Sequence, residues 1–377
     1  MKRAVMRRSP VLLLAVLVTL FAGIGAVRAE PTEADYRRLN DSLVERHVVP
    51  GYTRLAEATA GLSTAADTFC AAPSMPALEA LRGAYGAAAD AWQGIQHVRF
   101  GPVELFMRSV RFAFWPDPRN TVSRQLTSTL AARDPEAVAQ PAFDKGSIAV
   151  QGLPALERLL YGKDSAAALM ASGDDARYRC TMITAIAHNL AVIAKDVEAA
   201  WTKGDRPFAA VISQAGPDND RYRDPKEATL DLFKSLYSAI ELVADHKLAK
   251  PLGETLAAAR PSLAESWRSE RSLDNVRANL AAAEAMYRGE GGYGMSDFVR
   301  QAAGDAAFDD LLSRAFTQTR ATADRIALPL EAAVSDPAAR PAVEQLATEA
   351  AALKQLLVQR LSTALGIPVG FNALDGD

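Results

Sequence analysis

The sequence has few of the side chains on which metal and redox chemistry depends. In 377 residues it contains only two cysteines and four histidines, which are Cys70, Cys180, His47, His97, His188 and His246. No two histidines have the His-Glu-x-x-His spacing of a zinc peptidase. In an oxidising compartment, two cysteines without a second thiol pair favour a structural disulfide over a thiolate metal site. We therefore expect Cys70 and Cys180 to be bridged.

Runs in which Val, Ile and Thr alternate with polar residues are almost absent, so little of the chain can form a β-sheet. After the N-terminal region, we find no apolar run long enough to span a membrane. Alanine-rich segments with apolar residues three and four positions apart recur instead. They predict helices at 33–48, 51–70, 76–98, 180–203, 226–246, 253–287, 306–334 and 338–365. We expect an all-α protein made of long antiparallel helices.

The N-terminus has the pattern of a secretory signal peptide. Four basic residues, Lys2, Arg3, Arg7 and Arg8, precede an apolar run at 11–22, and small residues lie around Ala29. We expect cleavage near Ala29, with an uncleaved anchor helix as the alternative. No cysteine near this point offers a lipid anchor. The mature chain is then exported, most simply to a bacterial periplasm, with no transmembrane segment.

Charge limits the partners of the mature chain. Residues 1–29 carry five basic and no acidic side chains, so their removal lowers the formal charge from −3 to −8. An acidic protein is a poor ligand for nucleic acid or for an anionic membrane. We therefore expect no nucleic-acid partner.

The chain divides into two halves around a segment rich in Gly, Pro and Asp. This segment, 205–225, predicts a linker between a first bundle at 30–204 and a second at 226–377. A shift of 175 residues places Pro50 on Pro225, Trp92 on Trp267, and Leu153-Pro154 on Leu328-Pro329. These coincidences favour an internal duplication, and hence two related bundles that face each other.

Residues 152–162 read Gly-Leu-Pro-Ala-Leu-Glu-Arg-Leu-Leu-Tyr-Gly. This stretch resembles the signature of the imelysin-like family, which runs Gly-x-His-x-x-Glu before an apolar run and a glycine. Gly152 and Glu157 match, but Pro154 occupies the histidine position and has no lone pair to offer a metal. The segments 49–52, 69–73, 92–102 and 114–117 and the ending 370–377 also resemble landmarks of exported members of this family.

The resemblance implies paired helical bundles with the signature near their junction. It also implies a periplasmic component of iron uptake, in a family named after a proposed metallopeptidase whose histidine and glutamate bind metal. Because Pro154 replaces that histidine, we expect no catalytic residue here. Our main hypothesis is a binding or accessory protein in iron acquisition. Its partners would be iron, an iron-associated small molecule or other exported iron-uptake proteins. The alternatives are a metal-dependent peptidase with substitute ligands and a structural partner of an outer-membrane or redox protein.

We expect the ligand site at the junction of the bundles. Its candidate residues are Gln151, Gly152, Glu157, His97 and Arg108 from the first half, and Arg268 and Ser272 from the second. Within this set, Glu157 and His97, together with Glu104, would provide oxygen and nitrogen ligands suited to iron or another divalent metal. Arg108 lies among aromatic residues, and such arginines can hold planar anions. Glu157 and His97 also have a structural explanation. A carboxylate at a helix start and a histidine at a helix end are stabilised by the helix dipole.

Overall fold

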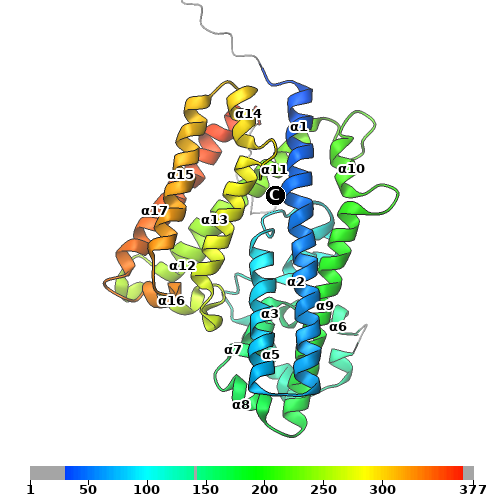
Figure 1. Ribbon diagram of the computed structural model, residues 1–377. Helices are drawn as coiled ribbons and strands as arrows, with labels where there is room; N and C mark the ends of the chain where they lie inside the picture. Colours follow the sequence, from blue (N-terminus) through cyan, green and yellow to red (C-terminus); the bar gives the residue numbers. More distant parts are fainter. Residues whose placement is uncertain (1–29, 140–141, 368–377) are drawn as a thin grey trace, which may run out of the picture.

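The computed structural model describes residues 30–139 and 142–367 of the chain (Figure 1). The expected signal peptide, its cleavage near Ala29 and the ending at 370–377 lie outside the described residues. Within the described part of the chain every regular element is a helix, and no strand is present. The predicted all-α fold class is therefore confirmed.

One long helix opens the fold and passes through both halves of the molecule. It comprises α1 (Glu33–Leu43), a π-helical turn (Val44–Val48) and α2 (Val49–Ala71). Thr32 caps its start through a capping box with Asp35. Proline within a helix removes one backbone hydrogen bond and crowds the preceding turn, and the π turn directly before Pro50 accommodates this. The predicted break of this helix at Pro50-Gly51 is therefore wrong.

The first bundle packs α2 against α3 (Met75–Gln93) and α9 (Asp174–Thr202) (Figure 1). On α3 the residues Leu78, Leu81, Tyr85 and Trp92 recur at helical spacing and are all buried, which explains why this face turns inward. Shorter helices close the bundle: α4 (Arg108–Phe112), α5 (Thr121–Ala132), α6 (Ala142–Lys145), α7 (Leu153–Tyr161) and α8 (Ser165–Met170).

The predicted disulfide is present. Cys70 at the end of α2 and Cys180 in α9 are bonded, with their Cα atoms 5.4 Å apart. Of the described helices, α9 alone is long and apolar enough to cross a membrane by length and composition, contrary to our reading of the sequence. Because 56% of its apolar window is buried inside the protein, it has the character of a core helix.

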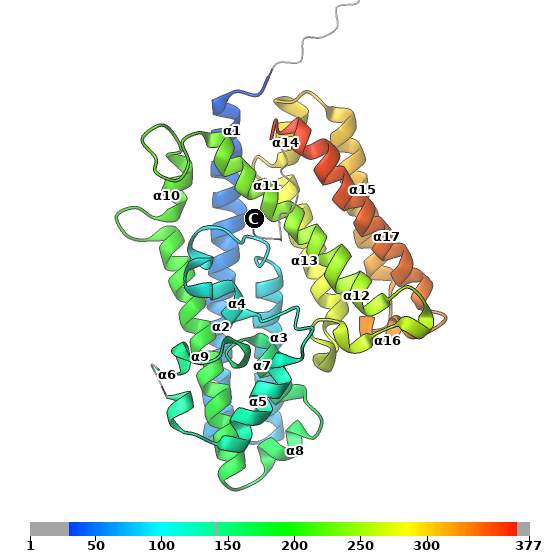
Figure 2. The same cartoon turned by 180° about the vertical axis from the view of Figure 1, so that it is seen from behind.

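The second bundle begins with a helix built like the first. It comprises α11 (Pro225–Glu241), a π-helical turn (Leu242–Leu248) and α12 (Ala249–Leu252), with Pro251 just after the π turn. The remaining helices are α13 (Ser272–Arg288), α14 (Met295–Gln301), α15 (Ala306–Arg325), α16 (Leu330–Ala333), α17 (Arg340–Leu356) and α18 (Ser362–Ala364). A π turn at Leu357–Leu361 joins the last two. Seen from behind in Figure 2, α11, α12 and α17 lie on the near side of this bundle.

The proposed halves are more closely joined than two bundles on a linker. In α1, Tyr36 Oη donates to the carbonyl of Leu365 at 2.9 Å and Asn40 Nδ2 donates to that of Pro225 at 2.7 Å. The start of the first helix thus packs in the second bundle. The segment 205–225 is folded, with α10 (Phe208–Ser213) and a buried Asn219 that bonds the carbonyls of Val211 and Gln214. The division at 205–225 stays a prediction.

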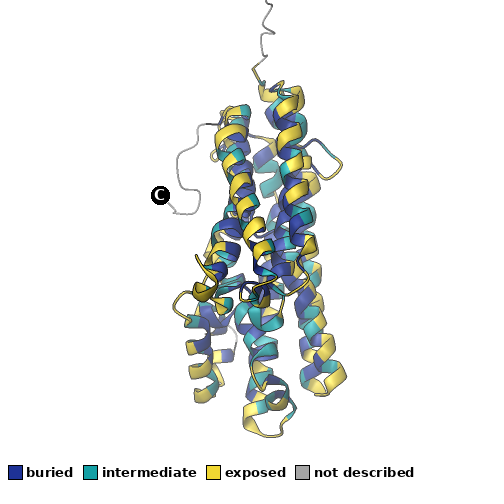
Figure 3. Ribbon diagram, turned by 90° about the vertical axis from the view of Figure 1, so that its left-hand side faces the viewer, coloured by how far each residue is buried: buried dark blue, intermediate teal, exposed yellow. Residues whose placement is uncertain are grey.

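Of the three pairs at the offset of 175 residues, only Leu153-Pro154 and Leu328-Pro329 lie in like positions, each at the start of a helix. Pro50 lies inside the first long helix, whereas Pro225 begins α11. Trp92 lies in α3, whereas Trp267 lies in a 3-10 turn, because 253–271 forms turns instead of the predicted helix. A long helix with a π turn before a proline is the feature that the two halves do share. Figure 3 shows the buried faces of the helices turned inward along the length of the molecule.

Candidate functional site

A pocket of about 630 Å³ lies where the two bundles meet. We call it the junction pocket. It is lined by the second half of α3, the segment 113–123 and the first turns of α7, which belong to the first bundle. The second bundle contributes His246, Lys250 and the segment 262–268. The volume falls in the usual range for sites that bind small organic ligands.

Glu157 joins the two bundles at this pocket. Leu153 and Pro154 start α7, which places Pro154 and Glu157 one turn apart on the pocket wall. The Glu157 side chain is only 3% exposed, and its Oε1 accepts hydrogen bonds from the backbone N–H (2.9 Å) and the hydroxyl (3.0 Å) of Ser269. Burial raises the pKa of Glu157, while the bonds from Ser269 and the charge of Arg268 lower it.

The segment that Glu157 holds has a strained backbone. Ser266 and Glu270 flank Trp267–Ser269 and have φ angles of 56° and 58°, in the left-handed region that non-glycine residues rarely adopt. The surrounding contacts must therefore determine this conformation. Gly152, directly before α7, has a structural role in close packing. A Cβ at this position would lie 2.6 Å from the carbonyl oxygens of Arg111 and Phe112.

Glu157→Leu is expected to lower the free energy of unfolding by about 1–3 kcal/mol, because both Ser269 donors lose a buried acceptor. Glu157→Gln keeps an acceptor oxygen of the same shape and is expected to cost less than about 1 kcal/mol. Urea unfolding of both variants measures the difference. Equal losses in the two variants would show that the charge of Glu157, and not its role as acceptor, stabilises the junction.

A buried ion pair lies beside the pocket. Lys247, in the second π turn, is 1% exposed and donates to Glu265 Oε2 at 2.5 Å and to Gln93 Oε1 at 2.6 Å. Asn275 Nδ2 and Gln93 Nε2 also donate to Glu265 Oε2, at 2.9 Å and 3.1 Å. Burial lowers the pKa of Lys247, and the charge of Glu265 raises it. The network thus holds the end of α3 against the second bundle.

Aromatic rings form much of the pocket wall. Trp92 stacks on Phe112 with ring centroids 4.5 Å apart, and its indole N–H is buried without a hydrogen-bond partner. Trp267 lies under the guanidinium of Arg268, whose Cζ is 4.4 Å from the ring centroid. Trp115 is the third tryptophan in the pocket lining. Three of the four tryptophans in the chain therefore line this pocket.

Only Glu157 and Arg268, of the predicted ligand residues, line the junction pocket. Gln151 is fully buried and its amide donates to the carbonyls of Phe143 and Gly146. Arg108 donates to the carbonyl of Pro102 at 3.0 Å and lies 3.6 Å from Asp196. Ser272 starts α13 and is buried outside the pocket lining. For Gln151 and Arg108 these contacts give a structural role.

The predicted metal ligands are not brought together. Glu104 is half exposed and its nearest cation is Arg221, at 3.8 Å. His97 is buried, and its Nε2 lies 2.8 Å from Nε2 of His47 in the first π turn. Within residues 30–139 and 142–367, no group of three His, Cys, Asp or Glu side chains is placed to hold a metal ion. The set of His97, Glu104 and Glu157 is therefore not assembled.

The burial of His97 makes folding sensitive to acid. Burial lowers the pKa of His97 well below its usual value, helped by His47 and Arg99. Below pH about 6.5, His97 therefore binds a proton in the unfolded chain but stays neutral in the folded chain. Stability is expected to be full above that pH and to fall by up to about 1.4 kcal/mol for each pH unit below it.

His97→Gln is expected to flatten this loss between pH 6.5 and 5, measured by urea unfolding at each pH. Glu157 acts in the opposite direction, since an acid with a raised pKa loses stability as the pH rises. The comparison of slopes between His97→Gln and the parent chain therefore isolates His97. An unchanged slope would contradict the assignment.

Comparisons with known proteins agree with the fold. The sequence model of the family described as Imelysin matches residues 48–358. The chain belongs to the imelysin family. It is 26% identical over 350 residues to "Iron-regulated protein A" of Synechococcus elongatus, covering 92% of this chain and 90% of that protein.

Two solved structures share the imelysin fold. An imelysin-like protein from Psychrobacter arcticum 273-4 has a TM-score of 0.74 at 22% identity, with 92% of this chain and all of that chain covered. A protein described as an iron-regulated protein A precursor, from Parabacteroides distasonis, has a TM-score of 0.69 at 18% identity, with 87% and 96% covered.

The metal centre implied by the family does not fit the residues of this imelysin-family chain. At the signature, Pro154 offers no ligand atom and Glu157 is already bonded to Ser269. Glu265, the other glutamate in the pocket lining, is bonded to Lys247. The signature position therefore offers no set of ligands for a metal ion.

Lys250, Glu265 and Trp115 line the junction pocket but were not predicted as site residues. Trp115 carried a signal, because the segment around it is rich in aromatic residues and differs from its surroundings. Lys250 and Glu265 carried none, since charged residues on helix and turn surfaces occur throughout the chain. The fold alone brings them to the junction.

Proposed function

We propose that the protein is an exported binding or accessory component in iron acquisition, and that its ligand binds in the junction pocket. The observation that carries the proposal is the pocket itself. It lies between the bundles, is lined by residues of both, and contains Glu157 of the family signature. Pockets with aromatic walls and a few charged groups are where small ligands usually bind.

The link to iron rests on relatives, and export rests on the N-terminal pattern. A relative that aligns over most of the chain is named "Iron-regulated protein A", and a structural neighbour is described as a precursor of such a protein. The basic start, the apolar run and the small residues near Ala29 support a cleaved signal peptide and a periplasmic location. The partners would be iron, an iron-associated small molecule or another exported iron-uptake protein.

The test uses the full chain expressed with its own signal peptide. The protein is purified from the periplasm of cells grown with and without iron limitation, then measured by native mass spectrometry and elemental analysis. We expect a small molecule released on denaturation, present in larger amount under iron limitation and lost in Trp267→Ala. A chain without bound molecule under both conditions would contradict the proposal. So would equal retention in Trp267→Ala.

Pro154→His tests whether the junction corresponds to the metal site of the family. The new side chain would lie one turn from Glu157 on the pocket wall. We expect Zn²⁺ to raise the melting temperature of this variant and not that of Pro154→Ala, because binding to the folded state alone stabilises it. Equal responses of the two variants would show that the junction does not hold a metal even with the histidine restored.

A further inference from the structure

The carboxylates of the junction pocket are already bonded to the protein. Glu157 accepts from Ser269, and Glu265 accepts from Lys247, Gln93 and Asn275. Asp117 uses both of its oxygens, each at 2.8 Å, for the backbone N–H groups of Thr121 and Val122 at the start of α5. The negative charges in the lining are therefore turned toward protein donors.

Several side-chain hydrogen-bond donors in the pocket lining, in contrast, have no acceptor among the described residues. Arg268 has five N–H donors and makes one hydrogen bond, at 3.3 Å, to the hydroxyl of Ser123. Lys250 has no hydrogen bond or ion pair with the described residues and lies exposed at the pocket wall. The N–H of Trp92, which is 3% exposed, has no partner. A buried donor without a partner costs free energy unless a ligand or water satisfies it.

The aromatic walls add a preference for flat molecules. Trp115 and Trp267 line the pocket with Trp92, and Arg268 already lies over the ring of Trp267. A stacked guanidinium beside an indole can bind a carboxylate by forked hydrogen bonds while the rings of the ligand stack on the wall. A metal cation would find each of the three carboxylates that line the pocket already bonded to protein donors through at least one oxygen.

We propose that the ligand of the junction pocket is a planar aromatic carboxylate. Its anionic group would be held by Arg268 and Lys250, and its rings would lie between the indoles of Trp115 and Trp267. This inference rests on the proposed function and goes further, because it assigns the charge and shape of the ligand and the two cations that select it.

The test compares two probes of equal size and different charge. Binding of naphthalene-2-carboxylate and of its neutral amide to the full mature chain is measured by titration calorimetry. We expect the carboxylate to bind at least about tenfold more tightly, because charge-assisted hydrogen bonds exceed neutral ones. Arg268→Gln is expected to remove that preference, and Lys250→Gln to reduce it.

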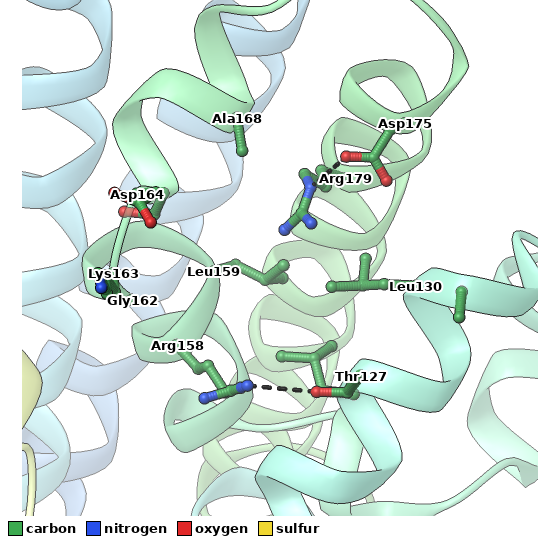
Figure 4. Close-up of a pocket in the computed structure, with 13 residues that line it drawn as sticks. Thr127, Leu130, Arg158, Leu159, Gly162, Lys163, Asp164, Ala168, Asp175 and Arg179 are labelled. Carbon is green, nitrogen blue, oxygen red and sulfur yellow. Dashed lines mark hydrogen bonds and ion pairs between the residues drawn. The ribbon is translucent and has the colours of Figure 1, made fainter.

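Arg158→Gln is the matched control, since it removes a positive charge close enough to act on Arg268 from a side chain that does not line the junction pocket. Arg158 lines a separate pocket of about 500 Å³ between α5, α7, α8 and α9, where it bonds to Thr127 at 3.2 Å (Figure 4). We expect it to bind the carboxylate like the parent chain. A loss in Arg158→Gln as large as in Arg268→Gln would show a general effect of charge and would overturn the inference.

Two further results would also overturn it. Equal affinity of the parent chain for acid and amide would show that the pocket does not select charge, while binding in the pocket and the proposed function would stand. No binding of the carboxylate by the parent chain would exclude planar aromatic carboxylates as ligands. The molecule recovered from the periplasm would then decide the proposed function separately.

Discussion

Lys247→Met is expected to lower the free energy of unfolding by about 3–5 kcal/mol, because it leaves the buried Glu265 without its cation. Lys247 and Glu265 are 1% and 7% exposed, and their charged atoms are 2.5 Å apart. Removal of Lys247 leaves a buried charge that only the neutral amide donors of Gln93 and Asn275 compensate. Urea unfolding of the purified mature chain measures the loss.

Lys247→Met combined with Glu265→Gln is the control. The amide removes the unpaired charge and keeps an acceptor for Asn275, so the double variant is expected to recover a large part of the stability. If the double variant is as unstable as the single one, the loss comes from packing around Lys247 and the ion pair is not what holds α3 to the second bundle.

Removal of the disulfide is expected to have an effect of similar size. The bond joins residues 110 positions apart, so the double variant Cys70→Ala/Cys180→Ala should lose about 4–5 kcal/mol in the chain-entropy account. Thermal unfolding of the oxidised parent chain and of the double variant measures the difference. A dithiothreitol-treated parent chain should behave like the variant.

The outcome that would contradict this prediction is a double variant within about 1 kcal/mol of the parent. The packing of α2 on α9 would then determine the geometry of the first bundle without help from the bond. Titration of free thiols in the denatured, unreduced protein is the matching check, and it should find none.

Local patterns predicted most of the long helices, because apolar spacing along a helix is a property of the sequence itself. The predicted helix 306–334 is divided, since α15 ends at Arg325 and α16 begins at Leu330, after Pro329. The predictions failed where distant contacts decide the conformation. The segment 253–271 is rich in alanine and was expected to be helical. Gly253, with φ of 61°, and Pro261 interrupt it, and Glu157 holds its end through Ser269. The contact between Glu157 and Ser269 joins residues 112 positions apart, so a local sequence pattern cannot predict it.

Only part of the predicted set of site residues meets in one pocket. Glu157 and Arg268 line the junction pocket, but His97, which the hypothesis of a shared site also requires, is absent from its lining. His97 lies elsewhere, against His47, which is 50 residues away in sequence and one of two histidines placed in π turns. Lone histidines carry no spacing signal, so the fold had to reveal this pair.

The function of the junction pocket is tested most directly by ¹⁹F NMR of the protein labelled with 5-fluorotryptophan. Trp92, Trp115 and Trp267 line the pocket, whereas Trp201 packs against Tyr52 and Phe208 away from it and serves as an internal control. Four resonances are expected, and single Trp→Phe variants assign them.

On addition of the small molecule recovered from the periplasmic protein, or of naphthalene-2-carboxylate, we expect the resonances of Trp115 and Trp267 to shift and that of Trp201 to stay in place. A shift of Trp201 with the pocket tryptophans unchanged, at ligand concentrations where calorimetry detects binding, would show that the ligand site lies outside the junction.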